Sequence, residues 1–221
     1  MIQGQLFTTT DSCSVVVFDF ETTGMSPQQG DRVIEVGAVR LKDGQIVDHF
    51  QSLINPEISL DPFVSDLTGI SDQMLCDAPQ AGHVFSDLKD FFGSSPLVAH
   101  NASFDKRFLD AEFERFALSV PTQIGCSMLA SRRVFPDAPN HKLDTLISYL
   151  ELPRAQRFHR ALEDASMTAV LWRRLEQELS SSYGFDEVPF HLLQRLGQVS
   201  CGRAVEFLRH AAKKQQEGRG C

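Results

Sequence analysis

Ser14–Thr22 read SVVVFDFET, and this stretch decides how the rest of the chain is arranged. Its density of β-branched and aromatic residues predicts a buried strand. Asp19 and Glu21 lie two residues apart in that strand, so their carboxylates point to the same face. Each buried ion costs several kcal/mol unless it is paired or bound to a metal. We therefore favour a metal site over an exposed polar strand end, and oxygen ligands select Mg²⁺ or Mn²⁺.

Further strands and helices are predicted on both sides of this segment. Two strands are expected at 32–41 and 46–54, joined by the hairpin signal Asp43-Gly44. Short strands are expected at 96–101 and 122–127. Amphipathic patterns and closing glycines predict helices at 61–68, 81–92, 103–116, 141–150 and 161–179. This order predicts an α/β fold, with a mixed five-stranded sheet flanked by helices.

The sequence also suggests how the chain divides. We expect a flexible N-terminus over 1–13, one domain over 14–180 and a helical C-terminal appendage over 181–221. The run Ser180–Ser182 resembles a linker, and short amphipathic helices are expected at 189–199 and 203–212.

Composition narrows the class of protein. The chain has 221 residues, 42% of them hydrophobic, which suits a globular protein. No apolar run is long enough to span a membrane, and the start lacks a signal-peptide pattern. The five cysteines are scattered without a CxxC pair, so a cytoplasmic protein with reduced thiols is expected. The net charge of −8 argues against coating long nucleic acid, but not against holding a strand end through metal ions.

Two more clusters contain residues suited to chemistry. HNASFD, at 100–105, follows a predicted strand and places Asp105 in the first turn of a helix. HRALED, at 159–164, places the loop residue His159 five positions before Asp164, which also begins a helix. Taken alone, each aspartate could simply favour the helix dipole, and a lone histidine is often structural. Beside a metal site, however, an imidazole can accept a proton near neutral pH.

The three clusters DFETTG, HNASFD and HRALED resemble, in order, the three exonuclease motifs of the DEDD superfamily. The position of His159 is similar to that in the His-containing branch, DEDDh, which includes the proofreading epsilon subunit of bacterial DNA polymerase III. The resemblance covers about 14–179. It implies a ribonuclease H-like fold and a metal-dependent 3′–5′ exonuclease of the DNA replication or repair type, which releases nucleoside 5′-monophosphates.

The resemblance also implies roles for individual residues. Two divalent ions would activate water and stabilise the leaving 3′-oxygen, with His159 as the general base. The implied metal ligands are Asp19, Glu21, Asp105 and Asp164. The implied substrate-binding residues, for which turn and core roles are the alternative, are Thr22, Thr23, Met25, Asn101 and Phe104. The loop arginines that either steer phosphates or are simply solvated are Arg154, Arg157 and Arg160.

Two other classes of protein fit the sequence less well. FDFET superficially resembles the Asp-x-Asp strand of HAD-type phosphatases, but Glu21 stands where the second aspartate belongs. A family member that has lost catalysis and only binds partners usually lacks one of the metal-binding residues. In this sequence all five key residues are present. The expected partner is a nucleic-acid 3′ end, with single-stranded DNA favoured and RNA the alternative. Gln3–Phe7 (QGQLF) resembles a sliding-clamp-binding peptide, so a clamp or a DNA polymerase is a further candidate, with an ordinary chain start as the alternative.

Overall fold

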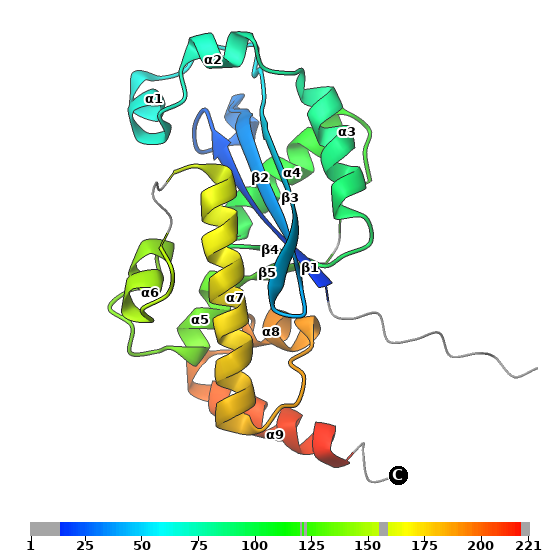
Figure 1. Ribbon diagram of the computed structural model, residues 1–221, viewed down its shortest axis with the longest axis vertical. Coiled ribbons are helices and arrows are strands. Elements are labelled where there is room, and N and C mark those ends of the chain that lie inside the picture. Colours follow the sequence, from blue (N-terminus) through cyan, green and yellow to red (C-terminus); the bar gives the residue numbers. More distant parts are fainter. Residues whose placement is uncertain (1–13, 120, 122, 155–158, 218–221) are drawn as a thin grey trace, which may run out of the picture.

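The computed structural model describes residues 14–119, 121, 123–154 and 159–217. Five strands form one mixed sheet in the order β3-β2-β1-β4-β5 (Figure 1). Strand β1 pairs antiparallel with β2 and parallel with β4, and β4 pairs parallel with β5. The strands are β1 (Ser14–Thr22), β2 (Val33–Lys42), β3 (Gln45–Leu53), β4 (Leu97–Ala99) and β5 (Ile124–Cys126). The expected mixed five-stranded sheet is therefore confirmed.

Helices cover both faces of the sheet (Figure 1). On one face, Phe18 of β1 packs with Phe85 of α3 and Phe108 of α4. On the other, Val17 of β1 packs with Trp172 of α7. The helices are α1 (Pro62–Thr68), α2 (Asp72–Cys76), α3 (Ala81–Phe92), α4 (Ser103–Arg115), α5 (Ser127–Val134), α6 (Leu143–Tyr149), α7 (Ala161–Tyr183), α8 (Phe190–Leu196) and α9 (Ala204–Glu217). Because side chains alternate along β1, Asp19 and Glu21 lie on the α7 face.

The C-terminal part differs from the expectation in one respect. Reading Ser180–Ser182 as a linker is wrong, because these residues belong to the last turns of α7, which ends at Tyr183 and is capped by Gly184 in the left-handed conformation. Helices α8 and α9 pack into the same apolar cluster as β1 and α7. The division of the chain at residue 180 stays a prediction. No described helix is long and apolar enough to cross a membrane. The QGQLF segment lies outside the described residues.

Candidate active site

Three elements bring the predicted carboxylates to one end of the sheet. Asp19 and Glu21 come from β1, Asp105 from the first turn of α4 and Asp164 from the first turn of α7. Since β4 runs parallel to β1, helix α4 starts at the carboxyl end of the same pair of strands. The backbone N–H of Phe20 donates to Oδ1 of Asp105 over 3.3 Å. This bond ties the start of α4 to the strand that carries the first two carboxylates.

Close packing between α7 and the sheet brings in the fourth carboxylate. Gly37 of β2 faces Asp19 across the β1–β2 ladder. A Cβ atom on Gly37 would lie 2.1 Å from the backbone nitrogen of Leu162, so only glycine permits this approach. The first turn of α7 therefore rests on the sheet beside Asp19, and it brings Asp164 with it.

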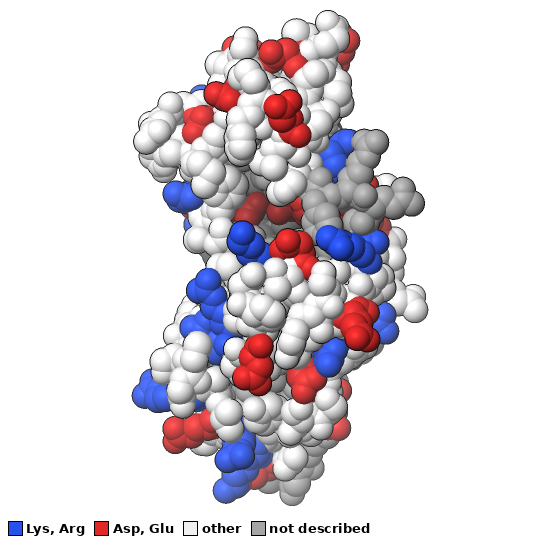
Figure 2. All heavy atoms as spheres, turned by 90° about the vertical axis from the view of Figure 1, so that its left-hand side faces the viewer, with Lys and Arg blue, Asp and Glu red and all other residues white. Residues whose placement is uncertain are grey.

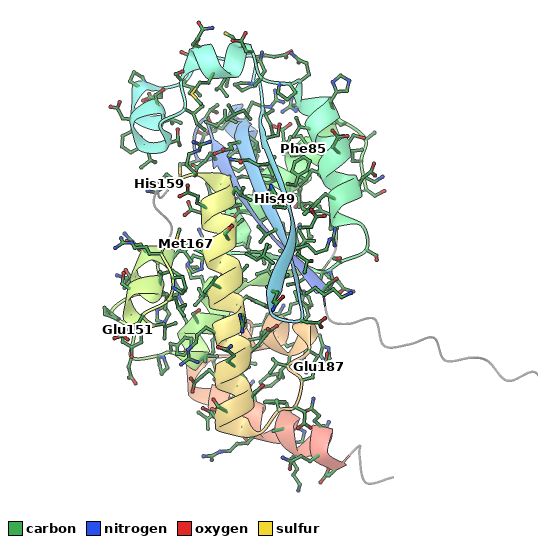
Figure 3. The ribbon with its side chains drawn as sticks, in the orientation of Figure 1. His49, Phe85, Glu151, His159, Met167 and Glu187 are labelled. Carbon is green, nitrogen blue, oxygen red and sulfur yellow. The ribbon has the colours of Figure 1, made fainter. Side chains whose placement is uncertain are left out.

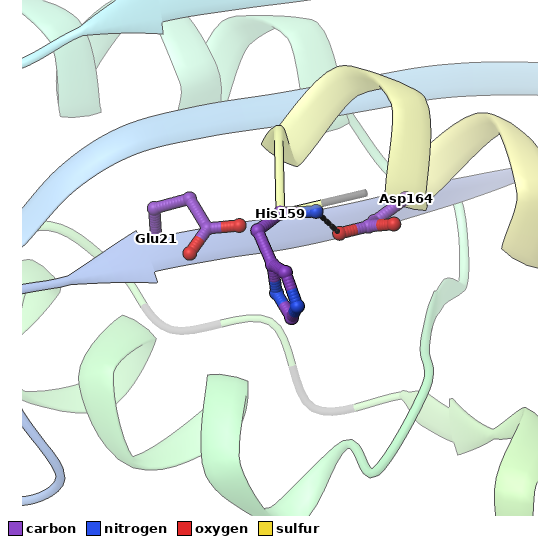
Figure 4. A group of neighbouring side chains, drawn as sticks. All are labelled: Glu21, His159 and Asp164. Atoms are coloured by element: carbon purple, nitrogen blue, oxygen red, sulfur yellow. Dashed lines mark hydrogen bonds between the residues drawn. The ribbon is translucent and has the colours of Figure 1, made fainter. Parts of the chain in front are cut away.

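His159 completes the group from the loop just before α7, at the end of the helix visible in Figure 3. Its backbone has a left-handed φ of 59°. Its N–H donates to Oδ2 of Asp164 over 3.1 Å, as Figure 4 shows. A ring nitrogen of His159 and one carboxylate oxygen each of Glu21 and Asp164 all lie within 4.8 Å of one another. The exposed imidazole therefore stands next to the carboxylate cluster.

Burial and mutual repulsion dominate the electrostatics of the cluster. Burial raises the pKa of Glu21 to about 8, of Asp105 to about 7 and of Asp164 to about 6. Burial also raises the pKa of Asp19 well above its ordinary value, and the carboxylates of Asp105, Glu21 and Asp164 raise it further. Figure 2 shows acidic side chains inside a hollow across the middle of one face, with Lys and Arg around it. Such a cluster favours the binding of cations.

The segment after Asp19 and Glu21 is held in a defined loop. The Thr22 hydroxyl donates to the carbonyl oxygen of Gly24 over 2.6 Å. The Thr23 hydroxyl donates to Oδ1 of Asp31 over 3.3 Å, and the backbone N–H of Ser26 donates to Oδ2 over 2.9 Å. Within this loop the side chain of Met25 is 71% exposed. Asp31, which the sequence did not single out, therefore organises the predicted substrate-binding loop.

The other predicted substrate-binding residues lie at the start of α4. Asn101 is exposed and has a left-handed φ of 63°. Phe104 is partly buried, with its ring 5.2 Å from the ring of Phe108, and the Arg107 guanidinium lies 5.7 Å from its centroid. The core alternative thus describes one side of Phe104, and the rest of its ring is exposed or lies near Arg107. The substrate-binding roles of all these residues stay predictions.

Glu35 and Arg160 form an ion pair that sequence reasoning missed. Glu35 is fully buried in β2 and faces Glu21 across the ladder. Nη2 of Arg160 donates to Oε1 of Glu35 over 2.8 Å, so this guanidinium binds a protein carboxylate rather than standing free for phosphates. A charged residue inside the apolar run RVIEVGAVRL was the available signal. Arg157 lies outside the described residues.

The sequence of this chain is similar to those of known proteins. A family model described as Exonuclease (RNase_T) matches residues 16–171. DNA polymerase III PolC-type of Caldanaerobacter subterraneus subsp. tengcongensis is 39% identical over 164 residues, covering 74% of this chain and 12% of the relative. The Bacillus subtilis (strain 168) protein of that name is 39% identical over 158 residues, covering 71% of this chain and 11% of its own. The chain thus spans only about an eighth of the length of these curated relatives.

Solved structures of nucleases have a similar fold. A structure of Exonuclease X in complex with 5′ overhanging duplex DNA aligns with a TM-score of 0.62 and 25% identity, covering 83% of this chain and 99% of that one. The nuclease domain of 3′hExo, a DEDDh family member bound to rAMP, aligns with a TM-score of 0.65 and 23% identity, covering 76% and 94%. The latter likeness shows the fold alone. The fold and the family model together define an exonuclease domain. The chain belongs to the exonuclease family, and the resemblance expected from its three motifs is confirmed.

Proposed function

We propose that this protein is a metal-dependent 3′–5′ exonuclease that removes nucleotides from the 3′ end of a nucleic-acid strand, with DNA as the favoured substrate. The observation that carries the proposal is the convergence of four carboxylates and a histidine at the end of β1. Each comes from one of the three motifs. Burial raises the pKa of Asp19, and repulsion by the carboxylates of Asp105, Glu21 and Asp164 raises it further. A structural role alone does not account for so many like charges in one buried place.

The residues present fit divalent cations. Oδ1 of Asp164 is buried and has no hydrogen-bond partner among the described residues, so it is available as a ligand. Asp19, Glu21, Asp105 and Asp164 together offer only oxygen atoms, which Mg²⁺ and Mn²⁺ prefer. When bound, two such ions would supply an activated water and stabilisation of the leaving 3′-oxygen.

His159 fits the role of general base. Its imidazole is exposed at the mouth of the cluster, within 4.8 Å of the oxygens of Glu21 and Asp164. From there it would take the proton of the attacking water while the phosphodiester bond breaks and a nucleoside 5′-monophosphate leaves. The bond from its backbone N–H to Asp164 links the position of the base to that of a metal-binding carboxylate.

The ordered loop that carries Met25 would hold the terminal nucleotide. The hydroxyls of Thr22 and Thr23 and the backbone N–H of Thr23 are engaged in bonds that shape the loop. Thr22 and Thr23 would therefore position the loop, and the exposed Met25 side chain is left to pack against the substrate. Phe104 offers its exposed part to a base, because stacking tolerates any base, and the exposed Asn101 stands beside it. Non-specific contacts of this kind suit an enzyme that removes every nucleotide in turn.

DNA is favoured over RNA by the relatives. The curated relatives are named as DNA polymerases, and Exonuclease X was solved with DNA. RNA trimming is the second candidate, because a similar fold is that of a 3′-exonuclease that recognises a histone mRNA stem-loop. A proofreading or repair role, with a polymerase or sliding clamp as partner, extends the same proposal.

The test compares hydrolysis of matched DNA and RNA oligonucleotides by wild-type protein and by His159→Ala. We expect wild type to degrade single-stranded DNA faster than RNA. We expect His159→Ala to lower kcat by about 10²–10⁴-fold, with little change in substrate affinity. Faster RNA hydrolysis would move the substrate to the second candidate. Unchanged turnover of His159→Ala would remove the histidine from the mechanism.

A further inference from the structure

The Glu35 carboxylate is saturated with donors although it is fully buried. Nε and Nη2 of Arg160 donate to it at 3.1 and 2.8 Å, Nε2 of Gln51 donates at 2.9 Å, and the backbone N–H of Ala161 donates at 3.2 Å. A buried ion pair is a weak source of stability, because apolar residues of the same volume often stabilise a fold as well or better. Its location beside the active site is therefore the more informative feature.

Arg160 sits at a junction of the backbone. It follows His159, whose φ of 59° is unfavourable for a residue other than glycine, and its own backbone is extended, with φ −133° and ψ 118°. It precedes Ala161, where α7 begins. Two consecutive non-helical residues thus lead into the helix, and neighbouring groups must hold them there. The Asp164 bond holds the backbone of His159, and the Glu35 bonds hold the side chain of Arg160.

Glu35 holds the start of α7 and the loop before it through different hydrogen bonds. The bond from the Ala161 N–H fixes the first residue of α7 and does not involve the Arg160 side chain. The guanidinium bonds act one residue earlier, next to His159. Loss of the guanidinium alone should therefore leave α7 and Asp164 in place and release the residue that carries the imidazole.

We propose that Arg160, held by Glu35, is a positioning residue that fixes His159 over the carboxylate cluster. This inference rests on the proposed function, in which His159 is the general base. It differs from the view that Arg160 binds substrate phosphates, because a phosphate ligand would act through its charge. A fixed planar guanidinium with two donors on one carboxylate acts through geometry, which lysine cannot reproduce.

The experiment is a double-mutant cycle on a labelled single-stranded oligonucleotide. It measures kcat and KM with Mg²⁺, oligonucleotide binding in EDTA and the melting temperature, for Arg160→Lys, His159→Ala and the double variant. We expect Arg160→Lys to lower kcat by about 10- to 100-fold, the range that an ångström of misplacement costs. KM, binding in EDTA and melting temperature should change little. In the His159→Ala background, Arg160→Lys should lower kcat less than about twofold, because a residue that acts through His159 has nothing left to position.

A matched control and a second variant keep the test decisive. Arg174→Lys changes an arginine within α7 that is also paired with a carboxylate, that of Glu178, and it should leave all four measurements unchanged. If Arg160→Lys does not fold, Glu35→Gln carries the same cycle, since the amide keeps the shape of the carboxylate but has one acceptor oxygen in place of two, so the guanidinium loses its two-point hold. Full activity of Arg160→Lys, or a loss that multiplies with that of His159→Ala, overturns this inference and leaves the exonuclease proposal standing. Unchanged kcat in His159→Ala alone overturns the histidine's role and this inference together.

Discussion

Gly37 faces Asp19 across the β1–β2 ladder, and it is also the point at which α7 touches the sheet. A Cβ atom at this position would lie within 2.3 Å of backbone atoms of Ala161 and Leu162. The missing side chain therefore sets how near the first turn of α7 comes to β1. The separation of Asp19 and Asp164, which come from different elements, depends on this one glycine.

Gly37→Ala should damage both the fold and the site. The added methyl group must push α7 away from the sheet, and overpacking of this kind costs about 1–3 kcal/mol of unfolding free energy. Since Asp164 moves with the helix, we expect turnover with Mg²⁺ to fall by about tenfold or more. Melting temperature and kcat are the measurements. Gly202→Ala is the control, because a Cβ atom there meets nothing within 4 Å. Wild-type values for Gly37→Ala would show that α7 can rest elsewhere.

Asp19→Asn should stabilise the metal-free protein and abolish its activity. In the metal-free protein the substitution removes one of four repelling carboxylates, so we expect a higher melting temperature in EDTA. With Mg²⁺ present, we expect no measurable hydrolysis, because a ligand is lost. Asp87→Asn, at an exposed position of α3, is the charge-matched control and should change neither quantity. A destabilised apo protein, or a variant that still turns over, would argue against a repulsive metal-binding cluster.

The raised pKa of Glu21 predicts how the stability of the metal-free protein depends on pH. Burial first, and then the carboxylates of Asp164 and Glu35, raise this pKa from 4.5 to about 8. The folded state therefore binds more protons than the unfolded state between these values. The contribution of Glu21 to the free energy of unfolding is largest below this window and falls as the pH rises through it.

Glu21→Gln removes that titration. The melting temperature of the variant in EDTA, relative to wild type, should therefore increase between about pH 5 and pH 8, across the window that separates the two pKa values. Differential scanning fluorimetry at several pH values gives the comparison. A difference that stays constant with pH would mean that Glu21 is ionised in the folded apo protein as easily as in the unfolded chain.

Asp31→Ala should weaken substrate binding. Asp31 accepts the bonds from Thr23 and Ser26 that order the loop carrying Met25, and it is not one of the four clustered carboxylates. We expect KM for an oligonucleotide to rise severalfold, with a smaller change in kcat. Steady-state kinetics measure both, and Asp90→Ala at an exposed position of α3 serves as control. A fall in kcat with constant KM would instead place Asp31 in the chemistry.

The proximity of the four carboxylates could be expected from the sequence because each motif has a local signature. The spacing of Asp19 and Glu21 predicts a shared face from strand geometry alone. Asp105 and Asp164, taken singly, are indistinguishable from ordinary residues of a first helical turn, so the order of the motifs was needed. Roles that depend on tertiary contacts, such as the pairing of Glu35 with Arg160, could not be predicted from the sequence. Nothing local shows that Glu35 would meet Arg160, 125 residues away.

Two helical segments differ from the expectation based on the sequence, and for a similar reason. Helix α5 went unpredicted because SMLASRRV is short and its apolar residues mark no continuous stripe. The serines at the end of α7 were read as a linker, although Gly184 beyond them offered the usual signal for a helix end. In both cases the deciding contribution is packing: α5, α7 and α8 share one apolar cluster, which stabilises helices of modest intrinsic propensity.

The central claim, metal-dependent removal of nucleotides from a 3′ end, is tested most directly by one labelling experiment. A single-stranded oligonucleotide of DNA carries the label at its 3′ end in one sample and at its 5′ end in the other, and each is incubated with Mg²⁺ or with EDTA. With Mg²⁺, the 3′ label should appear at once as a mononucleotide, while the 5′ label moves down a ladder one nucleotide at a time. Release of internal fragments, a mononucleotide from the 5′ end, or equal cleavage in EDTA would contradict the account.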